Sequence, residues 1–346
     1  MYGKYALKRI IHMLLTFIII IFIYSALFNT VMERTLEAQI TEQVRGEIIA
    51  RSNMTAKEIE VYKVERVKSL RLRYHLDDPI LSRIFWRGVD IITLNWGDST
   101  IITSLEGSRD VKKIIAEVIP NTLILFTTAI ALDILIGILL GIKKAQKPNK
   151  LLDQSTSIIT MIVYGMPSWW LAMIMIMVFV YIIPIFPSGG LHSVPPPEGF
   201  AYYLDILYHL ALPVITLIII GFWGRAYLTR NIVLGTLQED YIMSARARGL
   251  PESKVLYGHA LRSAAPPIVT MGVMSLLMSV SGSLVYEGIF SWPGMGNLYW
   301  ISVQQNDIPV LLGLLSVTTA LYLGGLVFLD LIYGFLDPRI KVGDKK

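Results

Sequence analysis

The sequence contains no cysteine and little charge for its size. Because none of the 346 residues is Cys, disulfide bonds, thiolate catalysis and metal sites with cysteine ligands are excluded. Charged residues make up 16% of the chain and hydrophobic residues 54%, whereas an average soluble domain carries about 25% charged residues. The composition therefore indicates a polytopic membrane protein and argues against a soluble enzyme.

The Gly-x-x-x-x-Gly-Lys-Ser/Thr loop that cradles nucleotide phosphates is also missing from the sequence. We therefore expect no ATPase site in this chain, and we predict no catalytic residue, no metal ligand and no cofactor bound by it. Such a protein would act by binding or transport and not by chemistry of its own.

The apolar residues are gathered in long blocks, each of about 20 residues or more, the length that crosses a bilayer core of ~30 Å. The first block follows Lys4, Lys8 and Arg9, as a signal peptide would. It is too long for a signal peptide and no small-residue cleavage site follows it, so we interpret it as a retained first span. The predicted spans are residues 10–31, 114–142, 155–183, 206–227, 266–289 and 310–336.

Lysine and arginine are distributed unequally between the two sides of these spans. They occur before the first span, in 143–150, in 230–262 and in the tail 337–346, and they are missing from 184–205 and 291–309. Basic residues in short loops stay on the cytoplasmic side. Both termini and the segment 230–262 are therefore predicted to be cytoplasmic, in a multi-pass protein of the cell membrane. The net charge of +5 is then a consequence of topology and does not indicate nucleic-acid binding.

The segment 32–113 is long, mixed in charge and predicted to lie outside the cell, where long loops translocate whatever their charge. Residues 54–76 are predicted to be helical, with 56–73 rich in Glu, Lys and Arg and without a single apolar stripe. We expect a small, largely helical external insertion. It is either a solvated helical hairpin packed on the membrane domain or a docking surface for an external partner.

The cytoplasmic stretch 238–265 is too polar for the bilayer and too regular for a linker. Residues 241–248 predict a short helix, and Gly249 stands where a left-handed C-terminal cap would be. Pro251 then suits the first turn of a second helix. The pattern predicts two short helices joined by a tight Gly-Leu-Pro turn. It is either an ordinary structured loop or a lever moved by a soluble partner.

Ten residues of this stretch resemble the signature of binding-protein-dependent ABC importer permeases, and most closely its dipeptide/oligopeptide branch, which shows Asp-Tyr-x-x-Ser/Thr-Ala-Arg-Ala-Lys/Arg-Gly-Leu. In that family the segment is the coupling helix that docks on the ATPase subunit. The general signature begins Glu-Ala-Ala, where this chain has Met243-Ser244-Ala245. The matching residues are Tyr241, Ser244, Ala245, Arg246, Ala247, Arg248, Gly249 and Leu250.

Other motifs of the same family follow in the same order along the chain. The segment 29–93 departs from the family, since it has no Pro-Gly-Asp-Pro turn after the first span, and this divergence puts the substrate in question. The similar runs are 117–122 (EVIPNT), 164–170 (YGMPSWW), 287–296 (EGIFSWPGMG) and 330–340 (DLIYGFLDPRI).

The resemblance implies an all-α subunit of the type I ABC importer fold, with six spans and an extracytoplasmic insertion after the first. It also implies partners: a second similar permease, two ATPase subunits that use ATP and magnesium, an external substrate-binding protein, and the lipid bilayer. The expected parts are 1–31 (cytoplasmic N-terminus and first span), 32–113 (insertion), 114–336 (five-helix core with the coupling segment 238–265) and 337–346 (tail). The implied substrates are di- and oligopeptides, with oligosaccharides or nickel as alternatives.

Ionisable residues inside spans are costly, so they are candidates for function. Asp133 lies in the second span and Asp330 in the sixth. The simplest interpretation is an interhelical hydrogen bond or a pair with Arg225. The fifth span carries a small polar face that suits either helix packing or a pathway wall. The candidate pathway or gating residues are Asp133, Ser275, Ser279, Ser283 and Glu287.

Two other functions remain open at this point. A secondary transporter driven by an ion gradient would use intramembrane acids, but the sequence shows no chain of acids and histidines. A receptor or scaffold would work through 32–113 and would not need the segment 241–250.

Overall fold

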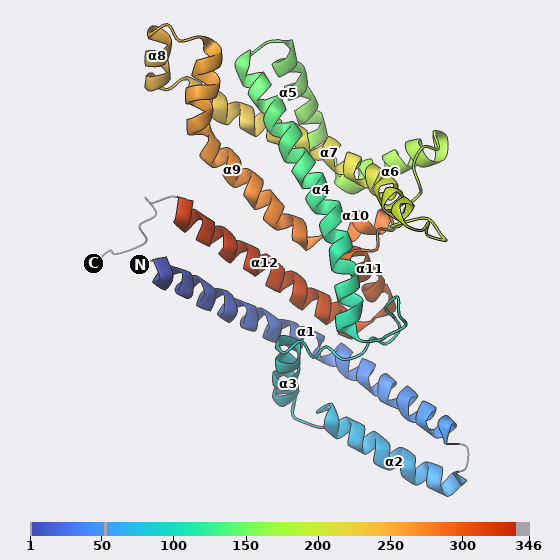
Figure 1. Ribbon diagram of the computed structural model, residues 1–346. Coiled ribbons are helices and arrows are strands. Elements are labelled where there is room, and N and C mark those ends of the chain that lie inside the picture. The colour runs from blue at the N-terminus through green and yellow to red at the C-terminus, as the bar shows by residue number, and fades with distance from the viewer. Residues whose placement is uncertain (1, 52–53, 337–346) are drawn as a thin grey trace. The chain divides into compact units, whose positions relative to one another are not determined.

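The computed structural model describes residues 2–51 and 54–336, apart from the side chains of Tyr2 and residues 332–336 (Figure 1). The predicted tail 337–346, and with it the end of the motif that begins at Asp330, lies outside the described residues. Throughout the described part the chain is helical, and its only β-type pairing is one isolated bridge between Asp98 and Asp110. The predicted all-α fold is confirmed.

Two compact units make up the chain. Unit 1 contains residues 1–118 and 299–346, and unit 2 contains residues 119–298. The divisions fall inside two helices, α4 (Val111–Gln146) and α11 (Met295–Gln305). The predicted parts were defined by their position relative to the membrane, which these units do not test. The division stays a prediction, with the parts 1–31, 32–113, 114–336 and 337–346.

In unit 1, α1 (Tyr2–Ala50) packs along α12 (Ile308–Leu336) and against α3 (Ile80–Ile92). With 49 residues, α1 is about 74 Å long, more than twice the ~30 Å of a bilayer core. Its apolar run ends near residue 31, but the helix does not, because charged residues favour a helix as much as leucine does. The predicted first span is therefore the first half of a longer helix.

The second half of α1 pairs with α2 (Ala56–Arg73). Thr55 and Glu58 form a capping box, in which the Thr55 amide donates to the Glu58 carboxylate at 2.8 Å. Arg66 binds Glu47 at 2.8 Å across the pair. The helix predicted for 54–76 is confirmed and is shorter at both ends, over 56–73. Charge pairs supplement a small apolar cluster made of Leu36, Ile40, Val44, Leu70 and Leu76.

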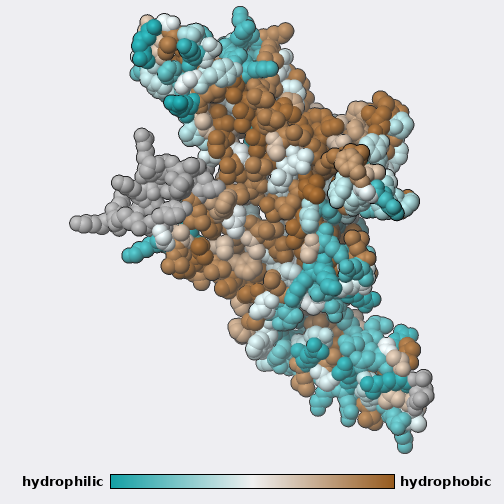
Figure 2. All heavy atoms as spheres, in the orientation of Figure 1, coloured by the Kyte–Doolittle hydropathy of each residue, from teal (hydrophilic) through white to brown (hydrophobic). Residues whose placement is uncertain are grey.

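Unit 2 holds the remaining long helices. Its part of α4 is joined by α5 (Leu151–Tyr164), α6 (Ser168–Ile176), the π-helical turn η1 (Met177–Ile182) and α7 (Phe200–Leu237). After α8 (Asp240–Ala247) come η2 (Lys254–Ala260), α9 (Leu261–Met278), η3 (Ser279–Ser281) and α10 (Leu284–Ile289). Figure 2 shows apolar side chains along α4 and α9 and polar ones around α8.

Two predicted spans differ from the helices that form. The third is broken at residues 165–167, where α5 and α6 meet at 98°, because Pro167 cannot continue the helix of α5. The fifth ends earlier than predicted, since Gly282 adopts φ +66° after η3. Residues 284–289 form the separate helix α10.

Five helices of the described chain are long and apolar enough to span a bilayer, and the bent pair α5–α6 makes a sixth. The predicted number of spans agrees with this count.

Candidate functional site

The predicted coupling segment forms a helix and a tight turn, as expected. Residues 240–247 are α8, and Gly249 follows at φ +78° with its amide bonded to the Arg246 carbonyl at 2.9 Å. This left-handed position suits glycine because it lacks Cβ. The second helix was predicted to be short. It starts at η2 instead and runs directly into α9, so the turn is tied to a membrane-spanning helix.

One face of α8 is buried and anchors it to unit 2. Ile242 and Ala245 are 0% and 1% exposed, and Ile242 packs in a cluster with Val233 and Leu237 of α7 and Val255 of η2. The other face has no contact partner that would bury it. Its exposed residues are Tyr241, Met243, Ser244, Ala247 and Arg248.

Three of the predicted coupling residues therefore do not face outward. Leu250 is partly buried and packs against the same cluster as Ile242. Ala245 is in the anchoring face. Arg246 folds back on its own chain, where Nε is 2.9 Å from the Glu252 carboxylate and Nη1 donates to the Leu237 carbonyl at 3.3 Å. Arg248, by contrast, is exposed and forms no ion pair within the described residues. Arg248 therefore adds a free positive charge to this surface, and Arg246 fixes the turn.

Below α8 lies a buried charge cluster that sequence reasoning missed. The Asp153 carboxylate of α5 meets Arg230 of α7 at 2.7 Å and Lys144 of α4 at 3.9 Å. The Lys144 side chain is 0% exposed. Lys144 and Arg230 were interpreted only as markers of the cytoplasmic side, and no spacing in the sequence reveals their shared acid. The cluster joins three helices at the end of unit 2 that carries α8.

Within the membrane-spanning part of unit 2, Asp133 binds Arg225. Arg225 Nε donates to Asp133 Oδ2 at 2.6 Å, and Nη2 donates to Ser275 at 3.1 Å. The predicted pair with Arg225 is confirmed for Asp133. Asp330 lies in unit 1 and instead pairs with Arg9 at 3.2 Å. Two candidate pathway residues, Asp133 and Ser275, are thus brought together by one arginine.

The other three candidate pathway residues lie near the break after the fifth span. Ser279 shares a hydrogen bond of 3.1 Å with Thr127. Ser283 caps α10, and Glu287 is fully buried. The Glu287 carboxylate accepts from the amides of Gly296 at 2.9 Å and Ser283 at 3.3 Å. These contacts describe a tightly bonded turn, and a pathway role for the five residues stays a prediction.

Comparison with known proteins places this architecture in a family. Residues 133–342 match the model of the binding-protein-dependent transport system inner membrane component. The chain is 31% identical over 270 residues to the oligopeptide transport system permease protein AppB of Bacillus subtilis, covering 78% of this chain and 83% of AppB. It is also 31% identical over 278 residues to the dipeptide transport system permease protein DppB of the same organism, covering 80% and 85%.

A third relative is named for a different substrate. The peptidoglycan transport system permease protein YejB of Agrobacterium fabrum is 33% identical over 282 residues, which cover 80% of this chain and 76% of YejB. All three relatives are aligned over most of their length, so the similarity includes more than the matched domain. Together with the helical membrane architecture and the anchored α8, these matches show that the chain belongs to the family of inner membrane components of binding-protein-dependent transport systems.

Proposed function

We propose that this chain forms half of the translocation pathway of an ATP-driven importer of di- and oligopeptides. α8 is the helix through which ATPase subunits move it. The observation that carries this proposal is the division of α8 into one buried face and one free face. A helix anchored on one side to α7 and η2 transmits force to the spans, while its free face remains available to a soluble partner.

The cargo is proposed from the relatives. AppB and DppB are named for oligopeptide and dipeptide transport. The name of YejB extends the range to peptidoglycan-derived material, which is itself part peptide. Oligosaccharides and nickel are the remaining alternatives from the family resemblance, and none of these relatives is named for them.

The partners and the energy source follow from the same proposal. The chain holds no nucleotide loop, so two ATPase subunits bind ATP and magnesium, and an external binding protein delivers the cargo. A second, similar permease completes the pathway. The excess of lysine and arginine at the N-terminus and around α8 supports a cytoplasmic position for both termini and α8, with 32–113 outside.

Arg248→Glu tests the role of α8 most directly. The complete transporter is reconstituted in vesicles, and peptide uptake and ATP hydrolysis are measured together. We expect Arg248→Glu to insert normally and to lose about tenfold or more in uptake per ATP hydrolysed, because a reversed charge on the free face weakens docking. Arg262→Glu is the matched control, since Arg262 is another exposed arginine of the same segment but lies in α9, whereas Arg248 directly follows α8.

Normal coupling in Arg248→Glu would contradict the assignment of α8. Uptake that persists without the ATPase subunits and collapses with an ionophore would instead indicate a secondary transporter.

A further inference from the structure

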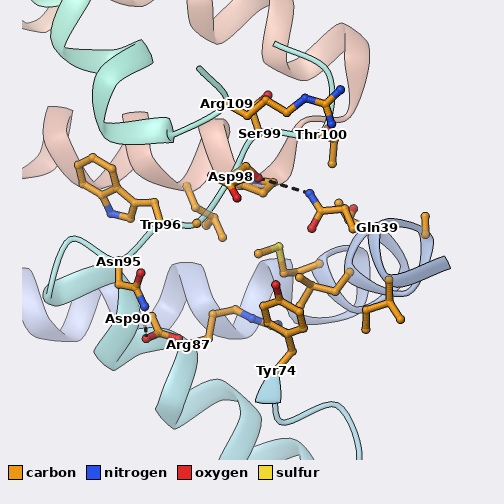
Figure 3. Close-up of a pocket in the computed structure, with 18 of the residues that line it drawn as sticks. Gln39, Tyr74, Arg87, Asp90, Asn95, Trp96, Asp98, Ser99, Thr100 and Arg109 are labelled. Atoms are coloured by element: carbon orange, nitrogen blue, oxygen red, sulfur yellow. Dashed lines mark hydrogen bonds between the residues drawn. The ribbon is translucent and has the colours of Figure 1, made fainter. Parts of the chain in front are cut away.

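Unit 1 contains a large cavity that no motif in the sequence predicted. Its volume is about 1310 Å³, larger than the ~300–1,000 Å³ of ordinary small-ligand sites. The second half of α1, the α3 helix, the loop 95–112 and the start of α12 line it (Figure 3). All of these segments belong to one compact unit.

The α3 wall of the cavity carries two arginines and one acid. Arg83 and Arg87 are one helical turn apart and both line the cavity. Arg83 pairs with Glu33 at 2.7 Å. Arg87 is 8% exposed, and its Nη1 donates only to the backbone and side-chain oxygens of Asn29, at 3.2 and 2.9 Å. No carboxylate among the described residues pairs with Arg87.

The acids close to Arg87 are already occupied. Glu33 is held by Arg83, and the Asp90 carboxylate accepts a hydrogen bond from Asn95 at 3.2 Å. Burial, with the neighbouring Arg83 charge as a second cause, lowers the pKa of Arg87 to about 10. Arg87 therefore stays protonated at neutral pH. Glu33 and Asp90 are near enough to favour its charged form, but neither forms a salt bridge with it within the described residues. Such a buried cation is stabilised strongly by a carboxylate that enters the cavity.

The remaining walls provide apolar surface and charges of both signs, with Asp98 and Asp110 beside Arg109 and Lys112. Asp98 lines the cavity from the loop, is exposed, and forms no ion pair within the described part of the chain. Trp96 and Tyr74 lie on two sides of the cavity, and Figure 3 shows Arg87 reaching between them from α3. The cavity thus combines positive charge, negative charge and aromatic rings. A short peptide with free termini has the complementary groups: a carboxylate, an ammonium group and apolar side chains.

We propose that this cavity binds short peptides on the permease chain itself, with the terminal carboxylate on Arg87 and the terminal ammonium attracted by the acids of the opposite wall. This inference rests on the proposed peptide cargo and on the external position of 32–113. A docked protein would need a surface of about 800 Å² on each side, whereas the charges described here lie inside a hollow.

The test compares one peptide in two forms. The assembled transporter, without its external binding protein, is placed in nanodiscs, and binding of the tripeptide Ala-Phe-Ala is measured by calorimetry. The free acid is expected to bind about tenfold or more tightly than the C-terminal amide, because Arg87 gains a charged partner only from the acid. Equal binding of the two forms, or no binding of either, overturns the proposal without any variant.

Variants then assign the effect to Arg87. Arg87→Gln is expected to remove the difference between acid and amide, and Arg87→Lys to restore part of it. Arg66→Gln is the matched control, since Arg66 is an arginine of the same unit that does not line the cavity. A difference that survives in Arg87→Gln places the carboxylate elsewhere and overturns the assignment.

A separate uptake assay with the complete system distinguishes this proposal from the proposed function. If peptides are taken up but the free acid binds no more tightly than the amide, the proposed peptide site in the cavity is contradicted and the proposed function is not. If the free acid binds more tightly than the amide but no peptide is taken up, the proposed peptide cargo is contradicted and the cavity site is not. Loss of binding-protein affinity in Arg87→Gln, with equal binding of acid and amide, would show that the cavity is a protein docking site and not a peptide site.

Discussion

Arg225 and Asp133 form a hydrogen-bonded ion pair of 2.6 Å that joins α7 to α4 within unit 2. Both side chains are mostly buried, at 13% and 9% exposed. Glycines make room for the pair: a Cβ on Gly137 would meet Arg225 at 2.8 Å, and one on Gly221 would meet Asp133 at 2.7 Å. The pair is therefore built into the packing of the two helices.

Removing one member of this pair is expected to cost far more than removing both. Asp133→Ala leaves Arg225 as a buried cation, which costs about 3–5 kcal/mol, whereas a double change of Asp133→Leu with Arg225→Met can be nearly neutral. Thermal unfolding of the purified protein in detergent measures the difference. Asp330→Ala is the control, because its pair with Arg9 is more exposed and is worth about 1 kcal/mol or less.

If the single and double variants are equally unstable, the pair contributes through packing volume and not through charge. If both are stable but transport is lost, Asp133 acts in the pathway, as the sequence analysis predicted for it.

Two alanines of α8 provide a matched pair of substitutions. Ala245 is 1% exposed in the anchoring face, so Ala245→Trp overpacks the contact with α7 and η2 and is expected to cost about 1–3 kcal/mol or more. Ala247 is exposed, so Ala247→Trp should fold normally and lose coupling between ATP hydrolysis and uptake. Yield and unfolding temperature report the first effect, and uptake per ATP hydrolysed reports the second.

A folded but uncoupled Ala245→Trp would mean that the buried face moves away during transport. A fully coupled Ala247→Trp would show that the free face of α8 docks no partner, which contradicts the proposed function.

Local signals in the sequence were sufficient for the helices and for the α8 turn. Apolar blocks predicted the spans, and Gly249 followed by Pro251 predicted the turn, because these features depend on neighbours within a few residues. The length of α1 was underestimated because the prediction relied on hydrophobicity. Hydrophobicity marks where a helix leaves the bilayer, and it does not mark where the helix ends.

Apart from the pair of Asp133 with Arg225, the long-range pairs could not be read from the sequence. Asp153 binds Arg230, which is 77 residues away. Even the local pair of Arg246 with Glu252 was not predicted, since Arg246 was expected to offer its charge to an external partner. Sequence spacing alone does not determine which acid pairs with a given basic residue, because different folds would bring different acids close to it. The cavity around Arg87 was missed because its walls come from segments that are far apart in the sequence.

Glu287 is expected to be required for folding of the turn that follows the fifth span. Its fully buried carboxylate accepts from Thr122 and from the amides of Ser283, Gly296 and Asn297. Glu287→Ala leaves these buried donors unpaired at about 1–3 kcal/mol each. Glu287→Gln keeps one acceptor oxygen and should lose less. Unfolding temperature measures the series.

Glu198→Ala is the control for this series, because Glu198 is exposed and lies in the same unit. Stable folding of Glu287→Ala with altered transport would assign Glu287 to the pathway and contradict a structural role.

Asp307 fixes one wall of the proposed peptide cavity. Its fully buried carboxylate accepts from the Ser99 hydroxyl at 2.5 Å and from the amides of Thr100 at 3.1 Å and Ile101 at 3.2 Å. One side chain thus holds the loop to the start of α12. In Asp307→Ala the Thr100 amide loses its acceptor, and the Ser99 hydroxyl that accepts from the amides of Ile101 and Ile102 is no longer held. Hydrogen exchange at residues 100–102 should therefore rise by about tenfold or more.

The exposed Glu106 lies in the same segment, and Glu106→Ala should leave this exchange unchanged. Because Thr100 and Ile101 line the cavity, the loosened loop of Asp307→Ala should also weaken binding of the free-acid tripeptide, whereas exchange near Arg87 on α3 stays slow. Faster exchange at residues 100–102 with unchanged peptide binding would show that this wall does not contact the ligand, and would confine the site to α1 and α3.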